Sequence, residues 1–211
     1  MPTFGSVFSG CGGMDLGFEQ AGWEPVWRIE WNADCQKILR LHSPCVPVFG
    51  DASKVQTLQL EAVDLIIGGF PCTDISLCSK GSKQNFDGPQ SGLVREFGRI
   101  VKALQPKYFV IENVPKLLSL WPELMTMGYF DDYEVEGKIL DVSDFGAYSR
   151  RKRAFFVGHF GKRSGREILD FSKINRPTFR TGGREDKLPM CLPWKGGVSL
   201  ERLGACVAVE I

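Results

Sequence analysis

A cysteine on a glycine-rich turn is the residue of this chain best suited to covalent chemistry. The apolar run Leu65–Gly69 predicts a buried strand, and Phe70-Pro71-Cys72-Thr73 follows it directly. The proline beside Cys72 limits how far the thiol can move. Such a turn exposes the thiol at the mouth of an α/β sheet. Because sulfur is strongly nucleophilic even when only partly ionised, Cys72 is a candidate for covalent catalysis.

A second group of residues could bind a nucleotide. The turn Phe8–Gly13 joins a predicted strand to a predicted helix, and its glycines let a ligand approach the backbone N–H groups closely. Glu30 follows about 20 residues on, where α/β nucleotide sites place a carboxylate against ribose hydroxyls. Trp31 could stack on an adenine, and Asp51 could accept from an exocyclic amine. Together they favour an adenosine-containing cofactor.

Strands and helices alternate along the chain, which predicts an α/β fold with a doubly wound, mostly parallel sheet covered on both faces. The predicted strands are residues 3–8, 24–30, 46–49, 63–67 and 108–111, followed by a strand pair over 133–140 and 154–160. The predicted helices are residues 14–21, 32–41 and 92–104. Residues 161–211 are rich in Gly, Pro and Arg, so we expect a domain over 1–160 and a short loop-rich basic appendage over 161–211.

Charge divides the chain unequally. Residues 1–149 carry 12 Lys/Arg and 19 Asp/Glu, whereas residues 150–211 carry 14 and 6. The densest basic cluster is Arg150–Arg153, and no acid intervenes between it and Arg166. This asymmetry predicts a polyanionic partner on the C-terminal part, with a solvated charged face as the alternative.

Composition excludes several other classes. The seven cysteines are scattered without a CxxC pair, which argues against a disulfide framework or a zinc site and favours a reducing, intracellular compartment. Two histidines without clustered ligands make a catalytic metal unexpected. No apolar run approaches the ~20 residues that a membrane-spanning helix needs. We therefore expect neither a metal nor a membrane, and a cytoplasmic or, in a eukaryote, nuclear location.

Five motifs in order make the chain resemble the cytosine-C5 DNA methyltransferases. They cover roughly residues 3–160, and the combination is highly specific. The motifs are Phe8–Phe18, Asp64–Cys72, Gly92-Leu93, Phe109–Val114 and Arg151-Lys152-Arg153.

The resemblance implies an S-adenosylmethionine-dependent methyltransferase fold and methylation of cytosine C5 in double-stranded DNA, as in restriction–modification systems. Cys72 would add to C6 of a base flipped out of the duplex. Glu112 would bind the N3 edge and Arg153 would bind the O2 oxygen, and Arg151, the other arginine of the motif, is also implied as a catalytic residue. The implied cofactor site consists of Phe8, Ser9, Gly10, Gly12, Glu30, Trp31, Asp51, Pro71 and Leu93.

The chain departs from the family pattern in two places. Tyr148-Ser149 replace the Pro-Gln that precedes the two arginines in the family. The segment Arg202–Val207 resembles the closing family motif only faintly. Just 43 residues, 159–201, run from the end of the predicted strand that follows Arg150–Arg153 to this segment. We therefore expect a shortened or missing target-recognition region, and a partner chain could supply that function.

Three alternatives stay open from the sequence. The chain could be a tRNA cytosine-C5 methyltransferase of the same fold, although Phe70-Pro71-Cys72 does not favour that branch. It could be a catalytically silent relative that binds cofactor or DNA, which the intact Cys72, Glu112 and Arg153 argue against. Glu112-Asn113, taken alone, could also cap a helix after the strand at 108–111.

Overall fold

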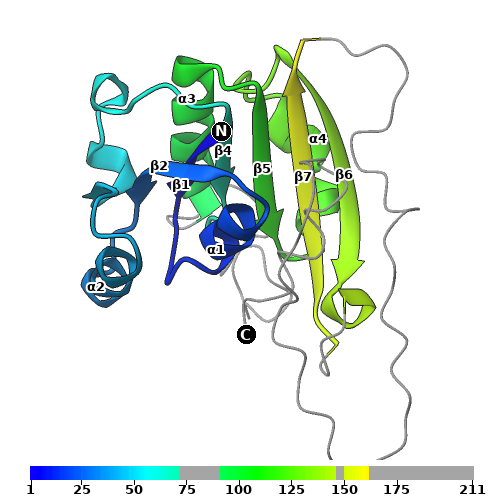
Figure 1. The fold of residues 1–211 in the computed structure, drawn as a ribbon. Coiled ribbons are helices and arrows are strands. Elements are labelled where there is room, and N and C mark those ends of the chain that lie inside the picture. The colour runs from blue at the N-terminus through cyan, green and yellow to red at the C-terminus, as the bar shows by residue number, and fades with distance from the viewer. Residues whose placement is uncertain (72–90, 146–149, 162–211) are drawn as a thin grey trace, which may run out of the picture.

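The computed structural model of the chain describes residues 1–71, 91–145 and 150–161, whose strands form a seven-stranded sheet (Figure 1). The strand order is β3-β2-β1-β4-β5-β7-β6. The strands are β1 (Thr3–Val7), β2 (Glu24–Ile29), β3 (Val48–Phe49), β4 (Leu65–Gly68), β5 (Tyr108–Asn113), β6 (Tyr133–Asp141) and β7 (Lys152–Phe160).

Parallel pairing joins the first five strands, and β7 runs antiparallel to both β5 and β6. The predicted mostly parallel sheet and the later strand pair are therefore confirmed. From β1 the chain winds outward through β2 and β3, and β4 then pairs on the other side of β1. Ligands of open α/β sheets bind at the carboxyl ends of the strands beside such a reversal. Because β1, β2, β4 and β5 run parallel, their carboxyl ends lie at this edge.

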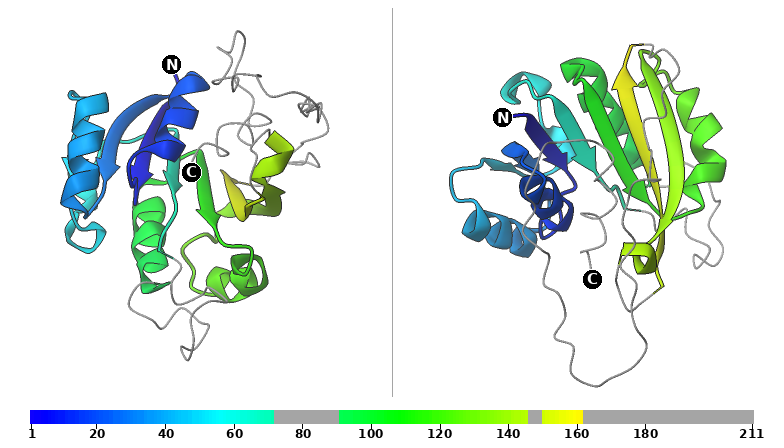
Figure 2. Two further views of the ribbon diagram at one scale, coloured as in Figure 1. Left: turned by 90° about the horizontal axis from the view of Figure 1, so that it is seen from below. Right: turned by 45° about the vertical axis from the view of Figure 1, so that its right-hand side comes forward.

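Helices cover both faces of the sheet, α1 on one and α3 with α4 on the other (Figure 2). The helices are α1 (Gly13–Gln20), α2 (Ala33–His42), α3 (Val94–Leu104) and α4 (Leu117–Met125). Successive side chains of a strand point to opposite faces. Accordingly Leu65 and Ile67 pack in the cluster that contains α1, whereas Ile66 packs in the cluster that contains α3 and α4. This double burial explains why β4 is apolar without alternation.

Two features after residue 105 differ from the prediction. Strand β5 continues through Glu112 and Asn113, so the helix-cap alternative for these residues is wrong. The next helix, α4, has Lys116 at its N-cap position. Helix α4 was not predicted from the sequence, because Pro122 lies inside it and proline removes a helical hydrogen bond.

Several predictions fall outside the described ranges, among them those for Cys72, for Tyr148-Ser149 and for nearly all of the 161–211 appendage. Within the described ranges, no helix is long and apolar enough to cross a membrane. The same ranges hold no group of three or more His, Cys, Asp or Glu side chains placed to bind a metal ion.

Candidate functional site

The turn after β1 has an unusual backbone. Phe8, Gly10 and Gly12 have φ angles of 59°, 55° and 89°, in the left-handed region that favours glycine. The turn is fixed by Ser9, whose N–H donates to the Ile29 carbonyl at 3.2 Å, and by the Gly12 N–H, which donates to the Ser9 carbonyl at 2.9 Å. A non-glycine residue such as Phe8 adopts this conformation at a cost that functional turns often carry.

Glu30 connects this turn to the start of α2. One carboxylate oxygen accepts the Gly10 N–H at 2.8 Å, and the other accepts the Asn32 N–H at 2.8 Å. The side chain is only 6% exposed, whereas the neighbouring Trp31 is 77% exposed. A carboxylate has about four acceptor positions, so two backbone bonds leave capacity for ligand hydroxyls. The structure thus brings Gly10 and Glu30, two of the residues proposed for the cofactor site, into direct contact.

Asp51 follows β3 and caps a short turn of 3₁₀ helix. Its Oδ1 accepts from the Ser53 hydroxyl at 2.8 Å and from the Ser53 N–H at 3.0 Å, and Lys54 Nζ lies 3.8 Å from Oδ2. The Ser53 hydroxyl and backbone bonds, helped by Lys54, lower the pKa of Asp51. Asp51 therefore stays ionised in mild acid, as an acceptor for an amine requires.

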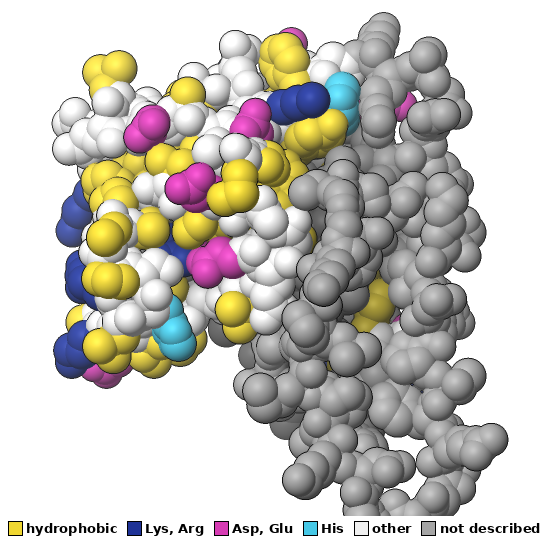
Figure 3. Space-filling view, viewed as in Figure 1, with side chains coloured by type: hydrophobic (Ala, Val, Ile, Leu, Met, Phe, Trp, Pro, Cys, Tyr) yellow, Lys and Arg dark blue, Asp and Glu magenta, His cyan; other side chains and the backbone are white. Residues whose placement is uncertain are grey.

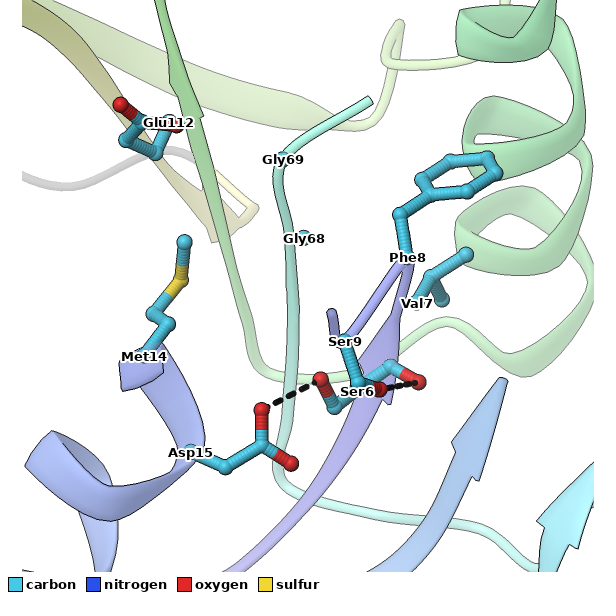
Figure 4. A pocket seen from close by; sticks show the side chains of 9 residues that line it. All are labelled: Ser6, Val7, Phe8, Ser9, Met14, Asp15, Gly68, Gly69 and Glu112. Atoms are coloured by element: carbon cyan, nitrogen blue, oxygen red, sulfur yellow. Dashed lines mark hydrogen bonds between the residues drawn. The ribbon is translucent and has the colours of Figure 1, made fainter. Parts of the chain in front are cut away.

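A cavity of about 40 Å³ opens between the ends of β1, β4 and β5 (Figure 4). Gly68 and Gly69 lie between Phe8 on one side and Glu112 on the other in this view. Of the predicted residues, Phe8, Ser9 and Glu112 line the cavity, together with Met14 and Asp15, which were not proposed from the sequence. Pro71 and Leu93 are partly buried beyond this lining.

Asp15 belongs to a buried polar cluster beneath the turn. Its carboxylate accepts from the Ser6 hydroxyl at 2.8 Å and pairs with Arg28 Nε at 2.7 Å, and Arg28 Nη2 contacts Glu19 at 2.6 Å. Asp15 and Arg28 are 1% and 2% exposed. Burial raises the pKa of Asp15, and Arg28 and Ser6 oppose that rise. The sequence signal that could have revealed Asp15 is an acid in the first turn of the helix that follows the glycine turn.

Glu112 and Arg153 form the ion pair of the candidate site. Arg153 Nε lies 2.8 Å from Glu112 Oε1, and the side chains are 23% and 16% exposed. In the β5–β7 register Glu112 lies opposite Phe155, so Arg153 is its diagonal neighbour on the same face. A Cβ on Gly69 would come within 3.1 Å of Glu112 Oε2, so glycine there lets the end of β4 approach the carboxylate.

Arg151 lies outside this pair. It is exposed, and its backbone N–H donates to Asp141 at 3.2 Å. Of the two arginines of the motif, Arg153 is the one that pairs with Glu112 at 2.8 Å.

Asn113 ties the end of β4 to β5. Its side-chain Nδ2 donates to the Phe70 carbonyl at 2.9 Å, and its Oδ1 accepts the Val114 N–H at 2.9 Å. The residue is 3% exposed, so both bonds are made away from water. Asn113 therefore fixes the backbone two residues before Cys72. No role for Asn113 was predicted from the sequence, because its partner is 43 residues away.

Comparisons with known proteins agree on one family. A family model described as "C-5 cytosine-specific DNA methylase" matches residues 3–186. The chain is 37% identical over 177 residues to the type II methyltransferase M.AquIA of Picosynechococcus sp., covering 73% of this chain and 70% of that protein. It is 35% identical over 164 residues to M.NgoFVII of Neisseria gonorrhoeae, covering 74% of this chain but only 43% of that protein.

Solved structures share the fold. A putative DNA modification methyltransferase encoded in an Escherichia coli prophage superposes with a TM-score of 0.63 at 27% identity, over 76% of this chain and 47% of that chain. The Dnmt2 methyltransferase of S. pombe gives a TM-score of 0.70 at 17% identity, over 86% of this chain and 57% of that chain. The chain thus spans about half the length of both solved proteins.

Proposed function

Because the chain belongs to the C-5 cytosine-specific DNA methylase family, we propose that it transfers a methyl group from S-adenosylmethionine to C5 of cytosine in DNA. The observation that carries this proposal is the ion pair between Glu112 and Arg153, whose side chains are 2.8 Å apart. Glu112 lies next to Gly69, which precedes Cys72 by three residues in the sequence. This pair supports the proposal because an acidic and a basic side chain lie side by side close to the residues that lead to Cys72.

The family depends on S-adenosylmethionine, and the residues at the β1 and β2 ends fit that cofactor. The positive-φ turn lets a ligand reach the backbone, and the Glu30 carboxylate retains acceptor positions for ribose hydroxyls. Trp31 offers an exposed aromatic face for the adenine, and Asp51 offers an ionised acceptor for its amine. When bound, the cofactor supplies an electrophilic methyl group.

The remaining chemistry falls to this chain's own residues. The Cys72 thiolate adds to C6 of cytosine, and the electrons of the C5–C6 double bond then make C5 nucleophilic. Glu112 holds N3 in its protonated form and accepts from the exocyclic amine, and Arg153 stabilises the negative charge that gathers on O2. After C5 has taken the methyl group, loss of the C5 proton and elimination of the Cys72 thiolate restore the C5–C6 double bond. O2 is attached to the ring atom next to N3, so these two groups of the base are neighbours, as Glu112 and Arg153 are in the protein. The base must leave the duplex to reach them.

Recognition of a particular DNA sequence needs side chains that reach base edges. The matched relatives extend beyond the region that this chain covers, and in M.NgoFVII the match takes in only 43% of the protein. We infer that target recognition depends on residues 162–211 or on polypeptide beyond these 211 residues, such as a partner chain. Addition of that partner should then raise site preference more than it raises the rate of methyl transfer on saturating DNA.

A methyl-incorporation assay tests the proposal. The full chain, labelled S-adenosylmethionine, and either mixed double-stranded DNA or tRNA are incubated together at high protein concentration. We expect label in DNA as 5-methylcytosine, its loss in Cys72→Ser, and its retention in Cys45→Ser, where the thiol is exposed on a loop away from the candidate site. Label confined to tRNA would favour the tRNA alternative, and label in neither would favour the silent alternative.

A further inference from the structure

Two cysteines meet between the glycine turn and α2. The Sγ atoms of Cys11, in the turn, and Cys35, in the first turn of α2, are 3.6 Å apart. Both are free thiols, with Cys11 exposed and Cys35 partly exposed. A disulfide requires an S–S distance of about 2.05 Å, so the two sulfurs would have to approach by only about 1.5 Å.

Neighbouring contacts hold the two thiols in this position. Next to Cys11, the Gly10 N–H bonds to the Glu30 carboxylate, which also accepts the Asn32 N–H. The Asn32 side chain in turn caps α2 by accepting the Cys35 N–H at 3.1 Å. On the other side of Cys11, a Cβ on Gly12 would come within 2.9 Å of Leu39 in α2. The turn and the helix are therefore packed together independently of the sulfur atoms.

We propose that Cys11 and Cys35 form a reversible disulfide that ties the glycine turn to α2 and weakens binding of the cofactor. The effect on the cofactor rests on the function proposed above. The Glu30 carboxylate holds the Gly10 and Asn32 N–H groups and keeps acceptor positions for ribose hydroxyls, so its place depends on these two segments. Formation of the S–S bond draws the Cys11 and Cys35 sulfurs about 1.5 Å closer and therefore shifts the segments that hold the carboxylate.

The reaction balances with an organic disulfide such as glutathione disulfide as the oxidant. The Cys11 thiolate attacks the S–S bond, forms a mixed disulfide and releases one glutathione thiolate. The Cys35 thiolate then attacks the Cys11 sulfur and releases the second glutathione. Two protein thiols are oxidised, and one glutathione disulfide is reduced to two thiols. Burial, and the nearby Cys11, raise the pKa of Cys35 to about 11, which favours Cys11 as the first nucleophile.

Peptide mapping after oxidation tests the link directly. The full chain is treated with glutathione disulfide, remaining thiols are alkylated, and the peptides are analysed by mass spectrometry. We expect a Cys11–Cys35 linked peptide that dithiothreitol removes, that persists in Cys45→Ser, and that is absent in Cys35→Ser. Separate alkylation of Cys11 and Cys35, or a link from Cys11 to another cysteine, would overturn the proposal.

Calorimetric titration with S-adenosylhomocysteine tests the consequence. Oxidised protein should bind at least ~10-fold more weakly than reduced protein, and dithiothreitol should restore the affinity. Cys45→Ser should respond in the same way, whereas Cys35→Ser should not respond to oxidation. Equal affinity of the linked and reduced proteins would refute the effect on the cofactor. If even the reduced protein failed to bind, the proposed function would fail, while the peptide map would still decide whether the disulfide forms.

Discussion

At the scale of single residues, the candidate site depends on pairs of side chains that come from different elements. Glu112 on β5 meets Arg153 on β7, and Glu30 after β2 meets Gly10 after β1. Each pair contains a carboxylate that is largely shielded from water, so the energy of the carboxylate depends strongly on the position of its partner. Changes at these residues should therefore alter the chemistry of the candidate site.

Arg153→Ala should reduce methyl transfer on saturating DNA by about 10²- to 10³-fold, the usual loss when one donor to a developing oxyanion is removed. DNA affinity should change less than ~10-fold, because the proposed partner of Arg153 is the flipped base rather than phosphate. Arg150→Ala is the matched control, since it removes an exposed charge from the same basic cluster and should keep the rate within a few-fold. Equal losses of rate and affinity in Arg153→Ala would argue against a role at the base.

Ser53→Ala should raise the pKa of Asp51 toward its ordinary value of 3.8, because it removes the strongest of the interactions that lower it. A carboxyl whose pKa is lowered by folding stabilises the protein above its unfolded pKa of about 3.9 and loses that stabilisation as pH falls through the folded pKa. The Ser53→Ala variant should therefore lose less stability through protonation of Asp51 as the pH falls. Carboxyl-carbon NMR titration measures the change, with Ser119→Ala as the control; an unmoved Asp51 midpoint would contradict it.

At the scale of elements, close approach of β4 to β5 positions the site. Gly69 follows β4 and faces the Glu112 carboxylate, and Asn113 holds the Phe70 carbonyl. Gly69 and Phe70, which make these contacts, follow the last residue of β4 and precede Cys72 by three and two residues. The carboxyl ends of β4 and β5 thus bring Glu112 close to the residues that precede Cys72.

Gly69→Ala should lower methyl transfer by roughly 10-fold, because its Cβ would lie 3.1 Å from Glu112 Oε2 and displace the carboxylate by a few tenths of an ångström. Gly50→Ala is the control, since its Cβ would have no atom within 4 Å. Single-turnover methylation should be slower for Gly69→Ala than for Gly50→Ala, whereas the melting temperatures of the two variants should agree. Identical rates for both variants would mean that the approach of β4 to Glu112 has no functional weight.

The sequence predicted the elements better than the contacts between them. The apolar run at β4 and the alternation of strands with helices were sufficient to predict a mostly parallel sheet, and Glu30 was proposed as a site residue from its place at a strand end. The Asp15–Arg28 pair and the Asn113–Phe70 bond were missed, because each joins residues that only tertiary folding brings together. Helix α4 was missed because Pro122 obscures its helical pattern.

At the scale of the whole molecule, the distribution of charge predicts which part of the chain would bind nucleic acid. Residues 1–149 have an excess of acids, and the basic excess falls in residues 150–211. On the described part of the face in Figure 3, acidic side chains are spread among apolar ones, and Lys and Arg side chains lie mainly along one edge. That part of the face thus presents no continuous basic surface, which is consistent with DNA docking on the C-terminal part.

Replacement of Lys162, Arg163 and Arg166 by alanine should weaken DNA binding evenly across sequences. The salt slope of log affinity should fall by about 1 for each phosphate that the variant no longer neutralises. Lys37→Ala with Lys54→Ala is the control, because both lysines are exposed in the acidic part and pair with Asp34 and Asp51. Fluorescence anisotropy at several salt concentrations gives the slopes. An unchanged slope in the triple variant would mean that this cluster is a solvated face.

The most direct test of the central claim is covalent trapping on DNA that contains 5-fluorocytosine. Fluorine at C5 blocks the final loss of the C5 substituent, so a thiol that has added to C6 stays attached after methyl transfer. In the presence of S-adenosylmethionine, we expect a stable protein–DNA adduct that peptide mapping assigns to Cys72. Cys72→Ser should abolish the adduct, and Cys11→Ser and Cys78→Ser should retain it. An adduct that persists in Cys72→Ser, or methylation of normal DNA without any adduct on the fluorinated DNA, would contradict covalent catalysis by Cys72.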